Sequence, residues 1–263
     1  MSLSNWISNA AVKFSSPEAI GEEQPLTDPH ISEPLILHTN PAYPLLLDKD
    51  QVVSGERFSV LRTRVLNAHA KSGIRSVMIT SPQTAEGKSL VCINLALSLA
   101  QLGKVPILLV DADLRVKGIS RLFSAEGDSG VGDFLENRAT LNASIRETNV
   151  PFLFVAGAGK LSEGSLPAVL EGSRWPKFLE QAKQQFKFII VDSVPVAAPI
   201  ADFELLSAAC DAVLLLVHLR KTTREALTLT MQRMDSKLLG LVINNIDVRV
   251  GSDYHSYYYP KKR

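Results

Sequence analysis

The nine residues Ser-Pro-Gln-Thr-Ala-Glu-Gly-Lys-Ser at 81–89 constrain this chain more than any other feature. A strand-like run at 77–80 leads into them, and a helix-like run at 90–101 follows. A tight loop between a strand and a helix N-terminus is an anion site, because its N–H groups converge and the helix dipole favours negative charge. The segment therefore predicts a phosphate-binding loop, in which Lys88 reaches the β- and γ-phosphates of a nucleotide and the Ser89 hydroxyl binds Mg²⁺.

The loop departs from the strict pattern G-x-x-x-x-G-K-[ST]. Pro82 stands where that pattern has its first glycine, and Ala85 stands where many such loops keep a small, flexible residue. The alternative is an ordinary strand-to-helix turn that happens to contain Gly-Lys-Ser. The flanking strand and helix, together with the acidic motifs below, favour the phosphate-binding interpretation.

Helical periodicity and continuous apolar runs alternate from residue 52 onward. We expect helices at 54–70, 88–101, 130–136, 141–147, 174–186 and 224–235, and strands at 75–80, 105–110, 152–155, 188–191, 212–217 and 238–243. Apolar strands separated by helices indicate an α/β fold with a mostly parallel sheet and helices on both faces, in a single domain over 51–248. Such sheets bind ligands at the carboxyl ends of their strands.

Aspartates follow two of these apolar strands. Asp111 and Asp113 come after the run at 105–110, and Asp192 comes after the run at 188–191. Aspartate is common at strand ends, so a solvated loop is the alternative for each. Because the strands meet the phosphate-binding loop at one edge of a parallel sheet, the three carboxylates instead predict oxygen ligands for Mg²⁺.

The two ends of the chain differ from the middle. Residues 1–50 hold six of the 14 prolines and are acidic, so we expect a flexible arm there. Residues 249–263 are expected to form a flexible tail, and they contain four of the five tyrosines: Tyr254, Tyr257, Tyr258 and Tyr259. Multiple tyrosines on a mobile segment favour a phosphate acceptor; an aromatic tail packed on the domain edge is the alternative.

Composition excludes several classes of protein. The net charge of +1 creates no field that would draw nucleic acid. No apolar run reaches the roughly 18 residues of a membrane span, and the N-terminus lacks a signal-peptide pattern, so we expect a cytoplasmic protein. Cys92 and Cys210 lie in apolar surroundings and are expected to be buried free thiols.

Taken together, these motifs resemble the bacterial tyrosine kinases that accompany polysaccharide export, a branch of the P-loop ATPases that include the Min and Par proteins. The resemblance covers about 50–263, through the loop at 81–89, the aspartate motifs at 110–115 and 191–195, the segment at 242–244 and the tail. Val194 replaces a family proline, and Ser59 replaces the middle arginine of an oligomerisation motif between Glu56 and Arg62. Positions 81–86 lack the extra lysine of the partition branch.

The resemblance implies an ATP- and Mg²⁺-dependent tyrosine autokinase that acts in trans on the tail tyrosines and regulates the chain length or export of an exopolysaccharide or capsule. It implies a homo-oligomer, activated by a membrane chain-length regulator (Wzz-like) that holds it at the inner face of the plasma membrane. It implies these roles: nucleotide binding by Thr84, Ala85, Glu86, Gly87, Lys88, Ser89, Leu90 and Asn244; Mg²⁺ binding by Ser89, Asp113 and Asp192; catalysis by Lys88, Asp111, Asp113 and Arg115.

The departures leave two other functions open. A regulatory ATPase would hydrolyse ATP to switch its assembly without phosphorylating protein. A nucleotide-dependent scaffold would bind ATP without turnover.

Overall fold

One mostly parallel sheet organises the computed structural model, which describes residues 34–37, 45–47, 52–125, 127–197, 201–234 and 237–246. Within these residues the strand order is β3-β4-β2-β5-β1-β6-β7, and every neighbouring pair is parallel except β3 with β4. The strands are β1 (Ser76–Thr80), β2 (Ile107–Asp111), β3 (Arg146–Glu147), β4 (Leu153–Ala156), β5 (Phe188–Asp192), β6 (Ala212–His218) and β7 (Leu238–Asn244).

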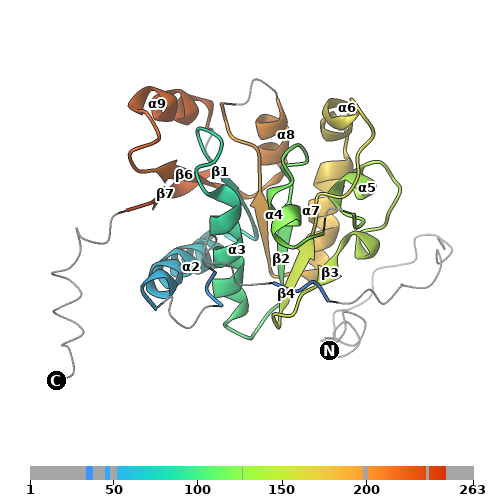
Figure 1. The fold of residues 1–263 in the computed structure, drawn as a ribbon, viewed down its shortest axis with the longest axis horizontal. Coiled ribbons are helices and arrows are strands. Elements are labelled where there is room, and N and C mark those ends of the chain that lie inside the picture. Colours follow the sequence, from blue (N-terminus) through green and yellow to red (C-terminus); the bar gives the residue numbers. More distant parts are fainter. Residues whose placement is uncertain are drawn as a thin grey trace.

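Helices cover both faces of the sheet (Figure 1). One face carries α2 (Val52–Ser72), α3 (Lys88–Ala100) and α4 (Gly118–Leu122). The other carries α5 (Val131–Leu135), α6 (Leu166–Glu171), α7 (Arg174–Gln185) and α8 (Asp202–Ala209). The helix α9 (Arg224–Arg233) lies between β6 and β7 in the chain.

Alternate residues of each central strand belong to the two cores. In β2, Leu108 and Val110 pack on the α7 side, whereas Ile107 and Leu109 pack on the α3 side. All five residues of β1, β2 and β5 are buried, which is why these strands read as continuous apolar runs in the sequence. The predicted α/β class, with helices on both faces, is confirmed.

The helix expected at 141–147 is wrong. Only a 3₁₀ turn forms, at Asn142–Ser144, closed by the Ser144 amide and hydroxyl donating to the Thr140 carbonyl. The chain then extends, and Arg146 and Glu147 pair antiparallel with β4. Strand pairing at the sheet edge overrides the local helical pattern here. Sequence reasoning also missed α4, α6 and α8, each of eight residues or fewer.

Two pieces of the expected flexible arm are packed on the domain. The Leu35 amide donates to the Glu147 carbonyl at 2.8 Å, and the Asn149 amide donates to the Leu35 carbonyl at 2.9 Å. Further along, the Leu46 amide donates to Asn94 Oδ1 at 2.8 Å. Three arm leucines, at 35, 37 and 45, are buried in the α3-side core. Apolar burial therefore holds 34–37 and 45–47 in place. The rest of the arm, and the tyrosine-rich tail, lie outside the described residues.

Cys92 and Cys210 are buried free thiols, as expected. Among the described residues, no helix is both long and apolar enough to cross a bilayer.

Candidate active site

The phosphate-binding loop and the aspartates meet at the carboxyl edge of the sheet. Strand β5 lies between β1 and β2, and Asp111 at the end of β2 is the register partner of Asp192 at the end of β5. The loop leaves β1 on the other side of β5 and enters α3, whose first residue is Lys88 (Figure 1). The topology thus brings together three segments that are up to about a hundred residues apart in the chain.

The loop takes an unusual backbone conformation. Ala85 has φ 55° and Gly87 has φ 99°, both in the left-handed region. A Cβ at position 87 would lie 2.5 Å from Asn244 Nδ2, so only glycine fits there. Asn244, predicted to bind the nucleotide, donates its side-chain amide to the Glu86 carbonyl at 2.9 Å. It therefore contacts the backbone of the loop.

Asp192 is the most unusual carboxylate of the site. It is 1% exposed, and neither of its oxygens has a hydrogen-bond partner among the described residues. Burial raises its pKa to about 7, with the neighbouring Asp111 carboxylate adding to the effect and the Ser89 hydroxyl and Lys88 ammonium opposing it. Gly118 packs so closely here that a Cβ on it would lie 2.5 Å from Ser89 Oγ and 3.6 Å from Asp192 Oδ2.

One carboxylate oxygen of Asp111 is hydrogen-bonded and the other has no partner among the described residues. Its Oδ2 accepts from the Ser120 amide at 2.8 Å and the Ser120 hydroxyl at 2.7 Å, whereas Oδ1 is buried without a partner. Burial raises the pKa of Asp111 to about 6, and the Ser120 hydrogen bonds limit the rise. Ser120 was not predicted, because nothing in the sequence marks a serine nine residues past a strand as a carboxylate partner.

Asp113 and Arg115 lie on the loop after β2. Asp113 is buried and accepts from the Val116 amide at 3.1 Å, and burial raises its pKa while nearby Lys88 opposes the rise. Arg115 extends instead to Asp202 at the start of α8, with Nε 2.8 Å from Oδ2. The structure therefore gives Arg115 a carboxylate partner at α8, which sequence reasoning did not identify.

The site's oxygens fit a hard divalent cation. In the parts of the chain that are described, no three His, Cys, Asp or Glu side chains are grouped to hold a metal ion by themselves. Yet three buried oxygens, both of Asp192 and Oδ1 of Asp111, have no hydrogen-bond partner among the described residues. Unpaired buried carboxylate oxygens are costly, and Mg²⁺ is commonly held by one or two carboxylates plus substrate phosphates.

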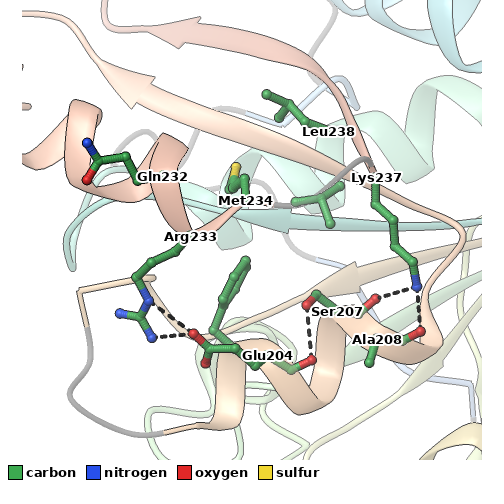
Figure 2. Close-up of a pocket in the computed structure, with 10 residues that line it drawn as sticks. Glu204, Ser207, Ala208, Gln232, Arg233, Met234, Lys237 and Leu238 are labelled. Atoms are coloured by element: carbon green, nitrogen blue, oxygen red, sulfur yellow. Dashed lines mark hydrogen bonds and ion pairs between the residues drawn. The ribbon is translucent and has the colours of Figure 1, made fainter.

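A separate pocket of about 510 Å³ lies between α8 and the α9–β7 segment (Figure 2). Its polar groups already bind one another: Arg233 pairs with Glu204, and the Lys237 ammonium donates to the Ser207, Ala208 and Cys210 carbonyls at the end of α8. None of the predicted site residues lines it.

A parallel sheet with a phosphate-binding loop after β1, a lysine at the start of α3 and aspartates at the ends of two adjacent strands defines a P-loop nucleotide-binding protein. The comparisons with known proteins narrow this class. The chain is 34% identical to a tyrosine-protein kinase, CpsD, of Streptococcus agalactiae over 208 residues, which cover 77% of this chain and 89% of the relative. A scan against protein-family models finds no match.

Solved structures agree with this relative. The kinase domain of the Escherichia coli tyrosine kinase ETK superposes with a TM-score of 0.68 at 26% identity, covering 73% of this chain and 75% of that one. A MinC:MinD cell division complex from Aquifex aeolicus shares the fold at a TM-score of 0.53 and 20% identity, over 68% of this chain and 72% of that one. The chain belongs to the bacterial tyrosine-protein kinase family, and the resemblance to that family is confirmed.

Proposed function

We propose that this protein is an ATP-dependent tyrosine autokinase, which transfers the γ-phosphate of ATP to the tail tyrosines of a neighbouring copy and so regulates the length or export of an exopolysaccharide or capsule. The observation that carries the proposal is the row of partnerless buried carboxylate oxygens beside the loop at 81–89, in a member of the tyrosine-protein kinase family. Family membership favours this function over the ATPase and scaffold alternatives.

The loop and Lys88 bind the phosphates. The backbone N–H groups of 84–90 provide the anion site at the start of α3, and the Lys88 ammonium offsets charge on the β- and γ-oxygens. Lys88 is 8% exposed, so its charge acts in surroundings where screening by water is weak.

Ser89, Asp192 and Asp113 would hold Mg²⁺, directly or through water. When bound, the ion supplies positive charge that neutralises the phosphate oxygens. Asp192 suits this role. Burial raises its pKa to about 7, and a nearby cation would favour its ionised form and so lower that pKa again.

Asp111 would orient the acceptor hydroxyl and take its proton. Ser120 fixes Oδ2, which leaves the partnerless Oδ1 to accept from a tyrosine. A free tyrosine has a pKa of about 10 and arrives protonated. With a pKa of about 6, Asp111 is mostly ionised at neutral pH, and phosphoryl transfer requires only a weak base because positioning and charge stabilisation dominate. Arg115 supports this loop through Asp202.

The last described strand, β7, ends at the same edge of the sheet as the loop. Strand β7 runs parallel to β6, so its end at Asn244 lies at the carboxyl edge with the loop. Each tyrosine that is phosphorylated gains about −1.5 to −2 charges at neutral pH. Four such groups would outweigh Lys261, Lys262 and Arg263, so copies of the tail would repel one another and the assembly would dissociate.

By resemblance to the family, a membrane chain-length regulator (Wzz-like) supplies a cytoplasmic segment that activates the kinase and holds it at the inner face of the plasma membrane. Ser59, in place of the family arginine, lies on α2, where its hydroxyl donates to the Gly55 carbonyl and Arg62 reaches the Ser98 carbonyl. Arg62 thus binds within the chain, and the partner's segment becomes the more important aid to assembly.

The test uses the full chain with Mg²⁺ and γ-labelled ATP, with and without the partner's cytoplasmic segment. We expect label on tyrosine, lost when Tyr254, Tyr257, Tyr258 and Tyr259 are all changed to Phe and retained in the matched control Tyr43→Phe. Lys88→Met should abolish labelling and keep the fold. Free phosphate without labelled protein would identify an ATPase, and nucleotide binding without turnover would identify a scaffold; either result would refute the kinase.

A further inference from the structure

Three consecutive carbonyl groups of the phosphate-binding loop accept hydrogen bonds from two side chains, one in the turn after β6 and one at the end of β7. The Lys221 ammonium, in the turn after β6, donates to the Thr84 carbonyl at 3.0 Å and to the Ala85 carbonyl at 2.9 Å. The next carbonyl, that of Glu86, accepts from Asn244 Nδ2 at 2.9 Å. Nothing in the loop motif itself predicts these contacts, because both donors come more than 130 residues later in the chain.

Because the carbonyls of 84–86 are held by these hydrogen bonds, peptide geometry also fixes the direction of the N–H groups that follow them. Each carbonyl shares a planar trans peptide with the N–H of the next residue, and the two groups point in opposite directions. The described residues contain no cis peptide bond. Carbonyls of 84, 85 and 86 that point to Lys221 and Asn244 therefore turn the N–H groups of 85, 86 and 87 the other way. Successive N–H groups on one side of a loop form an anion-binding nest.

The same turn also fixes the start of the loop. Glu86 is fully buried, and its two carboxylate oxygens accept from the Gln83 amide, at 3.0 Å, and from the Thr222 hydroxyl. Thr222 is itself fixed, because its Oγ1 accepts from the His218 amide at 3.0 Å. Lys221 and Thr222 thus bind the loop at adjacent points, and the turn that carries them is anchored to β6.

We infer that Lys221, assisted by Thr222 and Asn244, is a positioning residue that holds the amides of 85–87 ready for the phosphates of the nucleotide. This inference rests on the proposed nucleotide-binding function and adds a group outside the motif. It accounts for one of the two departures of the loop: Ala85 keeps a left-handed φ of 55°, a conformation disfavoured for alanine, because Lys221 binds the carbonyls on both sides of it.

The test compares Lys221→Met with Lys221→Arg and with Lys237→Met in the full chain. Lys237 is a matched control, because its ammonium also donates to backbone carbonyls but at the end of α8, in the pocket of Figure 2. Loss of a charge-assisted hydrogen bond to a partly exposed loop should weaken MgADP binding by calorimetry about tenfold in Lys221→Met. Lys221→Arg should retain most of the affinity, and Lys237→Met should bind as wild type.

Thermal unfolding without nucleotide separates positioning from folding. We expect Lys221→Met to unfold no earlier than Lys237→Met. Wild-type affinity in Lys221→Met, or a loss of affinity that merely follows a loss of stability, would overturn the inference. These readouts are independent of phosphotyrosine: a wild-type protein that binds MgADP but labels no tyrosine would refute the kinase function and leave the Lys221 comparison intact.

Discussion

Removing the charge of Asp192 should stabilise the nucleotide-free protein while destroying its Mg²⁺-dependent binding. Burial raises the pKa of this carboxyl from 3.8 to about 7, and both oxygens lack partners. A folded-state pKa above the unfolded one means that the folded protein holds the proton more tightly. The group's contribution to stability is therefore complete below about pH 4 and is lost as the pH rises through about 7.

The magnitude follows from the same pKa. The interval from 3.8 to about 7 corresponds to about 4 kcal/mol of lost stability at pH 8, at about 1.4 kcal/mol per pH unit. The Asn side chain of Asp192→Asn carries no charge, so this variant does not lose stability as the pH rises. Its melting temperature should exceed that of the wild type at pH 8 by about 8–16 °C, because 1 kcal/mol shifts the melting temperature of a domain this size by about 2–4 °C. At pH 5 the same arithmetic leaves a difference of about 2 kcal/mol, so the gap in melting temperature should narrow there and close only below about pH 4.

The assay is thermal unfolding between pH 5 and pH 8, first with a chelator and then with MgADP. MgADP should raise the melting temperature of the wild type and leave that of Asp192→Asn unchanged. Asp211→Asn is the control of opposite sign: although burial opposes it, hydrogen bonds from Lys183 and from the Ser76 and Arg75 amides lower the pKa of Asp211. That variant should be less stable than the wild type at pH 8. A wild-type pH profile in Asp192→Asn would refute the reasoning.

Two further predictions concern packing. Gly118→Ala places a Cβ 2.5 Å from Ser89 Oγ and should weaken MgADP binding about tenfold, because overpacking costs about 1–3 kcal/mol. The control Gly172→Ala makes only an ordinary 3.5 Å contact and should bind normally. Equal affinities in the two variants would contradict this account of the site. Leu37→Ala removes a buried arm side chain and should cost about 2 kcal/mol or more in urea unfolding, with MgADP affinity unchanged; an unchanged midpoint would show that the arm contributes no packing.

The sequence predicts those parts of the molecule that depend on local pattern. Strands β1, β2 and β5 are buried on both faces, so their apolar runs marked the sheet, and the aspartates that end β2 and β5 marked the edge where Asp111 and Asp192 meet. Contacts between segments far apart in the chain have no comparable signal in the sequence. Ser120 on Asp111 and Lys221 on the loop are ordinary polar residues in the sequence, and only the fold gives them partners.

The sheet edge was equally hard to predict. Strand β3 has only two residues, and its pairing with β4 and with Leu35 of the arm outweighs the helical pattern expected at 141–147. Proline-rich, acidic composition indicated a flexible arm, but composition averages over a segment and hides single buried side chains such as Leu37 and Leu45.

Helix α3 carries the phosphate-binding lysine at one end and binds the arm at its middle and at its other end. Lys88 is its first residue, and farther along Asn94 Oδ1 accepts from the Leu46 amide while Gln101, just past the last turn, reaches the Leu46 carbonyl. Thirteen residues make a rod of about 20 Å. Displacing Leu46 would therefore remove two hydrogen bonds from the same helix that begins with the phosphate-binding lysine, which ties the arm to the nucleotide site through one rigid element.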